Sequence, residues 1–141
     1  MAEIEVIDRF AGAPGDRELA IRAARAARLF AHAEDLTVSL LLTSDEEIAR
    51  LHGEHLQDPT PTDVMSFPMD GGVEVVVSVE CAQTKSRAHG GARDAELALY
   101  VVHGVLHACG FDDQTPQERA RMRDAECAVL ASLGWRASRV D

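Results

Sequence analysis

Two histidines, His103 and His107, stand four residues apart in the stretch HGVLHACGFDD, which ends on the carboxylates Asp112 and Asp113. On a helix, side chains at positions i and i+4 emerge about 40° apart around the axis and about 6 Å apart along it, so two imidazole nitrogens can converge on one ion. Gly110 can end such a helix and reverse the chain, because glycine accepts a positive φ. We therefore expect His103, His107 and Asp113 to bind one divalent metal ion, in the pattern H-x3-H-x5-D.

Three protein ligands leave a fourth position for water or substrate, which is the arrangement of a catalytic metal site. Histidines at this spacing also occur on solvated helix faces, where they bind nothing. The residues around this pair are apolar, which predicts a helix buried nearly all round, where unpaired histidines would be costly. The metal site is therefore favoured, although spacing alone selects Asp113 over Asp112 as the third ligand. The apolar neighbours are Val101, Val102, Val105 and Leu106.

The rest of the chain alternates between strand-like and helix-like patterns, which predicts a single α+β domain over residues 1–141. We expect a small mixed β-sheet of about four strands, packed with about five helices. Pro68 predicts an edge position for its strand, since proline cannot donate to the ladder. Strand patterns cover residues 3–7, 36–42, 64–69 and 73–79, and helix patterns cover residues 16–33, 45–56, 80–89, 95–109 and 116–133, with a proline-containing loop at 57–63.

Capping signals mark the starts of three of these helices. Ser44 with Glu47, and Thr115 with Glu118, have the spacing of a capping box, in which each side chain accepts from the other residue's amide. Asp94 is placed to cap the helix that carries the two histidines. These signals predict that the helices begin at fixed residues and so position what they carry.

The composition limits the function classes. With 14 basic and 24 acidic residues the formal net charge is -10, which argues against non-specific attraction to phosphate backbones. Three widely spaced cysteines fit neither a disulfide framework nor a cysteine zinc cluster, so a reducing compartment is the simplest inference. The stretch MAEIEVIDRF lacks the features of a signal peptide, and no run of 18 apolar residues occurs. We therefore expect a cytoplasmic protein without a membrane partner.

The histidine motif resembles a family signature. HGVLHACGFD is similar to the motif H-G-x-L-H-x-x-G-x-D-H of the YbeY family of rRNA-maturation endoribonucleases, and the chain departs from it at the last position, where Asp113 replaces histidine. Thr62–Phe67 looks like the family's T-D-V-L-S-F strand, and Val77–Glu80 falls where its I-S strand end lies. The likeness extends from about residue 36 to 134 and includes the C-terminal helix residues Glu118, Met122, Glu126, Leu130 and Gly134.

The resemblance implies a single-domain α+β fold and single-strand-specific RNA cleavage, linked to rRNA 3′-end maturation and ribosome quality control. Ribosomes or ribosomal proteins are the implied partners besides the RNA. It also implies a zinc ion held by three side chains: His103 and His107 match the first two ligands, and Asp113 stands in place of the third. We assign His103 as the catalytic residue, and expect Asp112 to orient an imidazole.

Two departures from the family pattern have chemical consequences. A carboxylate leaves the metal less electrophilic than a third imidazole would, so Asp113 predicts weaker zinc selectivity, with Mn²⁺ or another divalent ion as competitor. Leu56 stands where the family usually has an arginine, and leucine cannot assist phosphate chemistry. His52 and His55 most simply lie on an exposed helix face. Positive potential could come instead from a group of basic residues that a solvated helix face would explain equally well: Lys85, Arg87, His89 and Arg93.

Two other functions compete with the endoribonuclease. A zinc peptidase can share the H-x3-H-x5-D spacing, but such enzymes place a glutamate directly after the first histidine as general base, and here that residue is Gly104. A non-catalytic, ribosome-associated or RNA-associated protein could use the metal only to fix the helix end. The missing arginine and the acidic net charge favour this second alternative.

Overall fold

The computed structural model describes residues 3–56, 63–89 and 92–135. Thr62 and most of the expected loop at 57–63 therefore lie outside the described residues. The elements follow one another in the predicted order, with bounds that differ from the predicted ones by a few residues at most. They are β1 (Ile4–Asp8), α1 (Asp16–Phe30), β2 (Thr37–Thr43), α2 (Asp45–Leu56), β3 (Val64–Met69), β4 (Gly72–Ser78), α3 (Val79–His89), α4 (Arg93–Ala108) and α5 (Pro116–Ser132).

The four described strands form one mixed sheet in the order β1-β2-β4-β3. β2 pairs in parallel with β1 and with β4, whereas β3 pairs with β4 in antiparallel. The chain turns between β3 and β4 at Gly71, whose φ is 70°. Pro68 lies on β3 at the edge of the sheet, as its missing N–H predicts. The predicted α+β fold, with a small mixed sheet and five helices, is confirmed.

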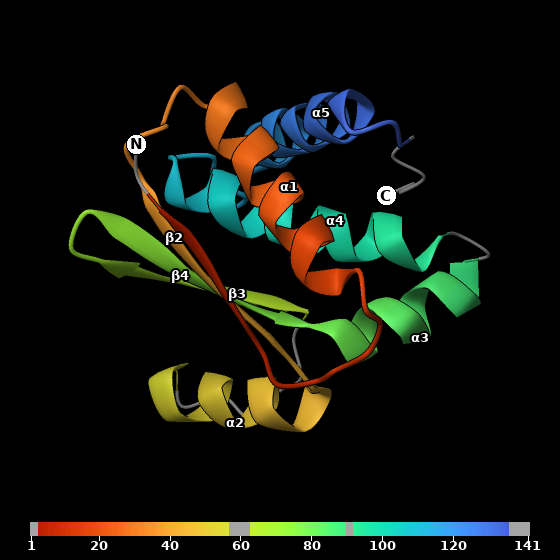
Figure 1. Cartoon of the computed structure of the whole chain (residues 1–141). Helices are drawn as coiled ribbons and strands as arrows, with labels where there is room; N and C mark the ends of the chain where they lie inside the picture. The colour runs from red at the N-terminus through yellow and green to blue at the C-terminus, as the bar shows by residue number, and fades with distance from the viewer. Residues whose placement is uncertain (1–2, 57–62, 90–91, 136–141) are drawn as a thin grey trace.

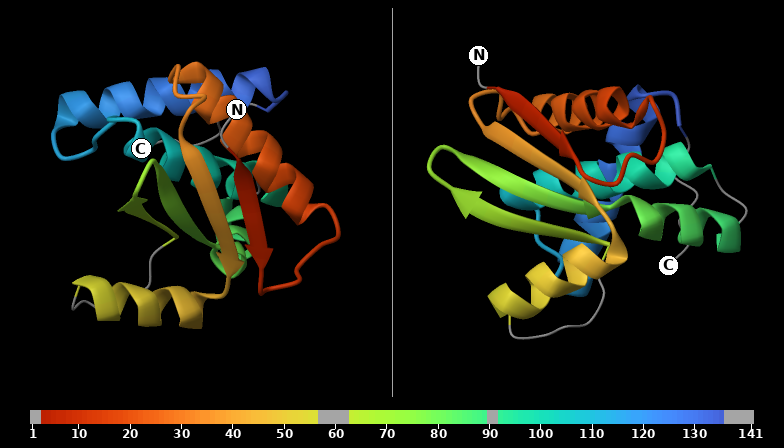
Figure 2. Two further views of the ribbon diagram at one scale, coloured as in Figure 1. Left: turned by 60° about the vertical axis from the view of Figure 1, so that its left-hand side comes forward. Right: turned by 60° about the horizontal axis from the view of Figure 1, so that its bottom comes forward.

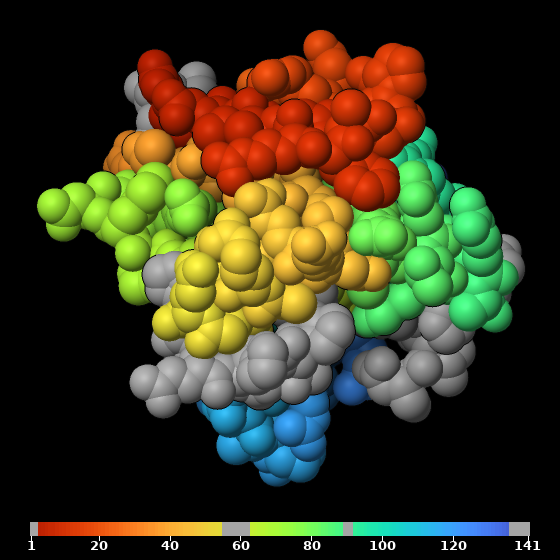
Figure 3. Space-filling view, turned by 90° about the horizontal axis from the view of Figure 1, so that it is seen from below, coloured from red at the N-terminus to blue at the C-terminus, as the bar shows by residue number. Residues whose placement is uncertain are grey.

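The helices cover the two faces of the sheet unequally. In Figures 1 and 2, α1, α4 and α5 lie on one side of the sheet and α2 lies on the other. Figure 3 shows the α2 side, with the β3–β4 hairpin projecting beside the helix. The core between sheet and α4 is aliphatic: Val75 and Val101 are fully buried, and so is Leu106. α4 is therefore held rigidly against β3 and β4, which fixes the position of its histidines.

The capping predictions were right at one helix and incomplete or wrong at two. Thr115 and Glu118 form the full capping box of α5, with Pro116 at the first helical position. At α2, the Glu47 amide donates to Ser44 Oγ at 3.2 Å, but the Glu47 carboxylate accepts from Thr43 Oγ1 and from Arg9 (2.8 Å). The second half of that box is replaced by contacts to other elements.

The predicted Asp94 cap of α4 is wrong. Ala92 occupies the N-cap position, and Asp94 lies inside the first turn. The cause is Arg93, whose guanidinium binds the buried carboxylate of Asp16 at 2.6 and 2.8 Å and also reaches Asp94 at 3.0 Å. This contact joins the starts of α1 and α4. In the described part of the chain, no helix combines the length and apolar character needed to cross a membrane.

Candidate active site

Gly104 allows α4 to lie unusually close to the sheet. A Cβ on this residue would be 2.5 Å from Val75 Cγ1 and 3.2 Å from Ser66 Oγ, so any side chain here would force its neighbours to shift. Ser66 Oγ of β3 donates a hydrogen bond to the Gly104 carbonyl at 2.9 Å. The two histidines flank this contact, and their rings stack with centroids 6.2 Å apart and planes 7° apart. The two imidazoles thus lie on one face of α4, as their spacing predicts.

His103 is held from behind by α5. Its Nδ1 lies 2.6 Å from Oε2 of Glu126, which is only 6% exposed. Because an ionised carboxylate can only accept, Nδ1 is the donor in this contact, and Nε2 is the nitrogen that the neutral ring would offer to a metal ion. Asp113 Oδ2 lies 3.7 Å from that Nε2. Burial alone would lower the pKa of His103, but the hydrogen bond and charge of Glu126, together with Asp113 and Asp63, raise it above its ordinary value.

His107 is held by the loop that follows α4. Its Nδ1 lies 3.0 Å from the carbonyl oxygen of Phe111, which again makes Nδ1 the donor and leaves Nε2 available. Gly110, with φ 102°, turns the chain back so that this carbonyl can reach the ring. Asp112, expected to orient an imidazole, lies 3.8 Å from the same Nδ1, beyond hydrogen-bond range. The backbone of Phe111 performs the orienting role instead.

These residues fit a divalent ion in chemical type. Metal-binding histidines usually donate their other ring nitrogen to a carboxylate or a backbone carbonyl, and His103 and His107 show one case of each. Asp113 adds an oxygen ligand of the kind that zinc and manganese accept. Their positions do not yet form a site: among the described residues, no three His, Cys, Asp or Glu side chains lie close enough together to hold a metal ion.

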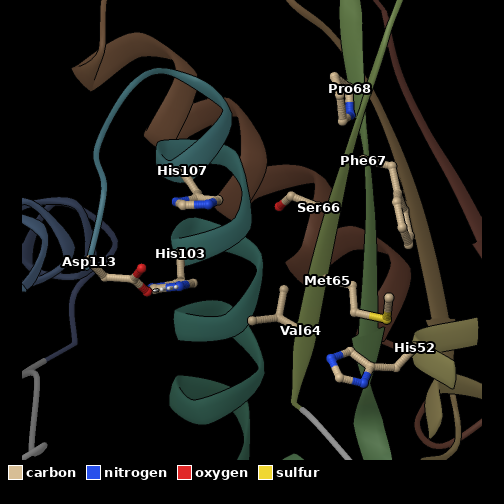
Figure 4. A pocket seen from close by; sticks show the side chains of 9 residues that line it. All are labelled: His52, Val64, Met65, Ser66, Phe67, Pro68, His103, His107 and Asp113. Carbon is tan, nitrogen blue, oxygen red and sulfur yellow. Dashed lines mark ion pairs between the residues drawn. The ribbon is translucent and has the colours of Figure 1, made fainter. Parts of the chain in front are cut away.

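The histidines open into a cavity of about 400 Å³ at the edge of the sheet (Figure 4). One wall is α4, and another is β3, the edge strand. Asp113 reaches in from the loop after α4, and Figure 4 shows it directed toward His103. No lysine or arginine lines the cavity among the described residues. The full lining is His52, Val64, Met65, Ser66, Phe67, Pro68, His103, His107 and Asp113.

Two site residues were missed by sequence reasoning. Glu126 was noted only for its match to the family's C-terminal helix, because nothing in the sequence shows which face of α5 meets His103. His52 was expected on an exposed helix face, yet it lines the cavity from α2. The sequence feature that could have indicated this position is the spacing of His52 and His55, three residues apart on one helix. The side chains of His55 and of Leu56, which stands at the position of the family arginine, lie outside the described residues.

The four basic residues expected near the site separate into different roles. Lys85 Nζ binds Asp63 Oδ2 at 3.0 Å. Asp63 directly precedes Val64, the first of the β3 residues that line the cavity, so this ion pair borders the site. Arg93 is bound to Asp16, away from the cavity, and Arg87 is exposed on α3. The side chain of His89 lies outside the described residues.

Cys109, which lies within the histidine motif, packs against the core and is only partly buried. It also lines a cavity of about 170 Å³, separate from that of the histidines, together with Asp112 and Arg121. Burial raises the pKa of its thiol, which keeps the sulfur protonated and a poor metal ligand.

Comparisons with known proteins agree with the motif. The family model described as Endoribonuclease YbeY matches residues 16–134. Two relatives named Endoribonuclease YbeY are each 34% identical to the chain: the one from Heliobacterium modesticaldum over 72% of either chain, and the one from Thermobifida fusca over 90% of either chain. The solution structure of a Thermotoga maritima protein superposes with a TM-score of 0.66 at 23% identity, covering 93% of this chain and 91% of that one, which is a likeness of fold.

Proposed function

The chain belongs to the YbeY family, and on that premise we propose that it is a metal-dependent endoribonuclease that hydrolyses single-stranded RNA. Its role is the maturation of rRNA 3′ ends and ribosome quality control. The ribosome or a ribosomal protein is the partner, the cytoplasm is the location, and residues 1–141 act as one metallohydrolase domain. The relatives' name supports the RNA-cleaving activity, and the finer assignments rest on the family resemblance.

The observation that carries the proposal is the state of the two imidazoles. Each ring has its Nδ1 occupied by an acceptor, so each offers Nε2, and both rings line the same cavity as Asp113. His103, His107 and Asp113 would hold the ion, which is expected to be zinc or a competing divalent ion such as Mn²⁺. A divalent ion bound there would polarise the scissile phosphate or lower the pKa of a water molecule.

The chain's own residues then do the positioning. Glu126 keeps the proton of His103 on Nδ1 and fixes the ring plane, because it is buried and bound at 2.6 Å. Phe111 does the same for His107 through its carbonyl. β3 supplies a fixed wall beside the reacting phosphate, since Ser66 is tied to the backbone of α4. His103 is assigned as the catalytic residue because its Nε2, 3.7 Å from Asp113 Oδ2, would contact the ion that acts on the phosphate.

The peptidase alternative has no support in the site. A glutamate at position 104 would be needed as general base, but a Cβ there would collide with Val75 and Ser66. The binding alternative keeps one supporting observation: among the described residues the cavity lining contains no lysine or arginine. The charge of the cavity therefore does not distinguish an RNA-binding protein from an RNA-cleaving one, and an activity assay is needed to do so.

Cleavage of a synthetic single-stranded RNA by three proteins tests the proposal. We expect wild type to cleave, and both His103→Ala and chelator-treated wild type to lose activity, with circular dichroism confirming that all are folded. His32→Asn is the control, because His32 is exposed with a φ of 54° and asparagine tolerates that conformation. Equal cleavage by all samples would indicate a contaminant. RNA binding without cleavage by wild type would support the non-catalytic alternative.

A further inference from the structure

The cavity does not stop at the histidines but continues around the open edge of the sheet. Successive residues of β3 point to opposite faces. Val64 and Ser66 face α4, because both lie against Gly104. Met65 and Phe67 face α2, where they pack with Ile48. Since residues of both kinds line one cavity, the hollow must pass the outer edge of β3, and Figure 4 shows the two sets of side chains on opposite sides of the strand.

The two ends of this cavity differ in chemistry. The α4 end holds two imidazoles and a carboxylate, which suit an ion and a phosphate. The α2 end is formed by Met65, Phe67 and His52, so it presents an apolar surface with two flat rings. Phe67 and His52 are both partly exposed, and Phe67 packs at the rim of the small cluster of Ile48, Met65 and Val76. A planar apolar ligand fits this end better than an ion does.

Apart from a bound divalent ion, RNA at the α4 end meets no positively charged side chain in the described lining, so another source of affinity is needed. The chain carries a net charge of -10, and among the described residues no lysine or arginine lines the cavity. Stacking of bases on aromatic side chains, histidine included, is the other common source of affinity for single-stranded RNA. A cavity of about 400 Å³ lies near the lower end of the range for small-ligand pockets, which suits one nucleotide.

We propose that the α2 end of the cavity is a nucleobase subsite, in which the base beside the scissile phosphate passes the edge of β3 and stacks on Phe67 with His52 beside it. This inference rests on the proposed endoribonuclease function and adds a place for the substrate's base. It also provides a physical reason for single-strand preference, because a base paired and stacked in a duplex cannot turn around the strand edge.

A double-mutant cycle, which combines substitutions of the protein's rings with removal of single RNA bases, tests the subsite. The substrate is a synthetic single-stranded RNA whose cleavage site has been mapped, together with versions that carry one abasic position on either side of that site. For wild type we expect one abasic position to lower kcat/KM by about 5- to 150-fold, the range for loss of one stacked base. His52→Ala and Phe67→Leu should cleave the intact RNA less well than wild type does. In these variants the loss of kcat/KM caused by an abasic position, the abasic penalty, should shrink only at the position where wild type is sensitive.

Two further variants separate stacking from other roles. His52→Phe keeps a flat ring without a titrating nitrogen and should restore the abasic penalty. Arg50→Ala is the control on the same helix, because Arg50 bonds Glu47 and Glu54 on the surface, and it should behave as wild type. Thermal unfolding confirms that each variant is folded. His52→Ala, which does not alter β3, decides the matter if Phe67→Leu is unstable.

The same abasic penalties in wild type and His52→Ala would overturn the subsite while leaving the endoribonuclease function intact. Absence of cleavage by folded wild type would instead overturn the proposed function. In that case, fluorescence anisotropy with the same RNAs still decides the subsite: binding that is weakened by an abasic position in wild type, but not in His52→Ala, supports it. Binding that is indifferent to abasic substitution contradicts it.

Discussion

Replacing Glu126 by glutamine removes the charge behind His103 while keeping the side chain's size. In the folded protein the carboxylate bonds Nδ1 at 2.6 Å and is 6% exposed. A hydrogen bond to a charged group contributes about 1.5–3 kcal/mol, and 1.4 kcal/mol corresponds to a factor of ten. We therefore expect Glu126→Gln to weaken zinc and manganese binding by about 10- to 100-fold, the range found for partners of metal ligands.

The assay is competition for metal against a chromophoric chelator, which requires no RNA. Asp124→Asn is the matched control, because it removes one negative charge from an exposed position of the same helix. In metal-free protein, NMR titration should also show a lower pKa for His103 in Glu126→Gln, because the hydrogen bond and charge that raise it are weakened. Equal metal affinity in Glu126→Gln, Asp124→Asn and wild type would refute the reasoning.

Three further results are expected. Asp113→His should raise the ratio of zinc to manganese affinity, measured by the same competition, because a neutral third imidazole replaces a carboxylate; an unchanged ratio would count against Asp113 as a ligand. Gly104→Ala should lower the free energy of unfolding in urea by about 1–3 kcal/mol through overpacking against β4, whereas Gly15→Ala, with open space around it, should change it by about 1 kcal/mol or less. The hydrogen bond from Thr43, together with nearby arginines, lowers the pKa of Glu47 below its ordinary value. The ionised Glu47 carboxylate therefore stabilises the folded protein fully at a pH above its pKa in the unfolded chain. This stabilisation is lost as the pH falls through its pKa in the folded protein. Glu47→Gln should therefore be less stable than wild type at pH 7 by about 0.5–1.5 kcal/mol, and chemical denaturation should show the two converging below about pH 4.

Local sequence patterns were sufficient for the order of the elements and for the histidine motif. His103, His107 and Gly110 are close in sequence, and the helix geometry that relates them is the same in every protein. The capping box at Thr115 is local for the same reason. Asp113 lies near His103 because Gly110, with its positive φ, reverses the chain within a few residues.

Several of the failures involve residues distant in sequence. Asp94 did not cap α4, because Arg93 is bound by Asp16, which lies 77 residues earlier. Glu126 lies 23 residues after His103, and its role depends on how α5 packs against α4. His52 could be assigned to the cavity only after the position of β3 at the sheet edge was known. Such contacts are set by packing, which no periodicity in the sequence encodes.

The most direct test of the metal site is anomalous diffraction from crystals soaked with Zn²⁺ or Mn²⁺, recorded at the absorption edge of each metal. We predict one peak at the edge of the sheet, within bonding distance of Nε2 of His103, Nε2 of His107 and a carboxylate oxygen of Asp113, with Glu126 still bound to Nδ1 of His103. Density without a peak in the cavity, and with Asp113 directed into solvent, would contradict the account.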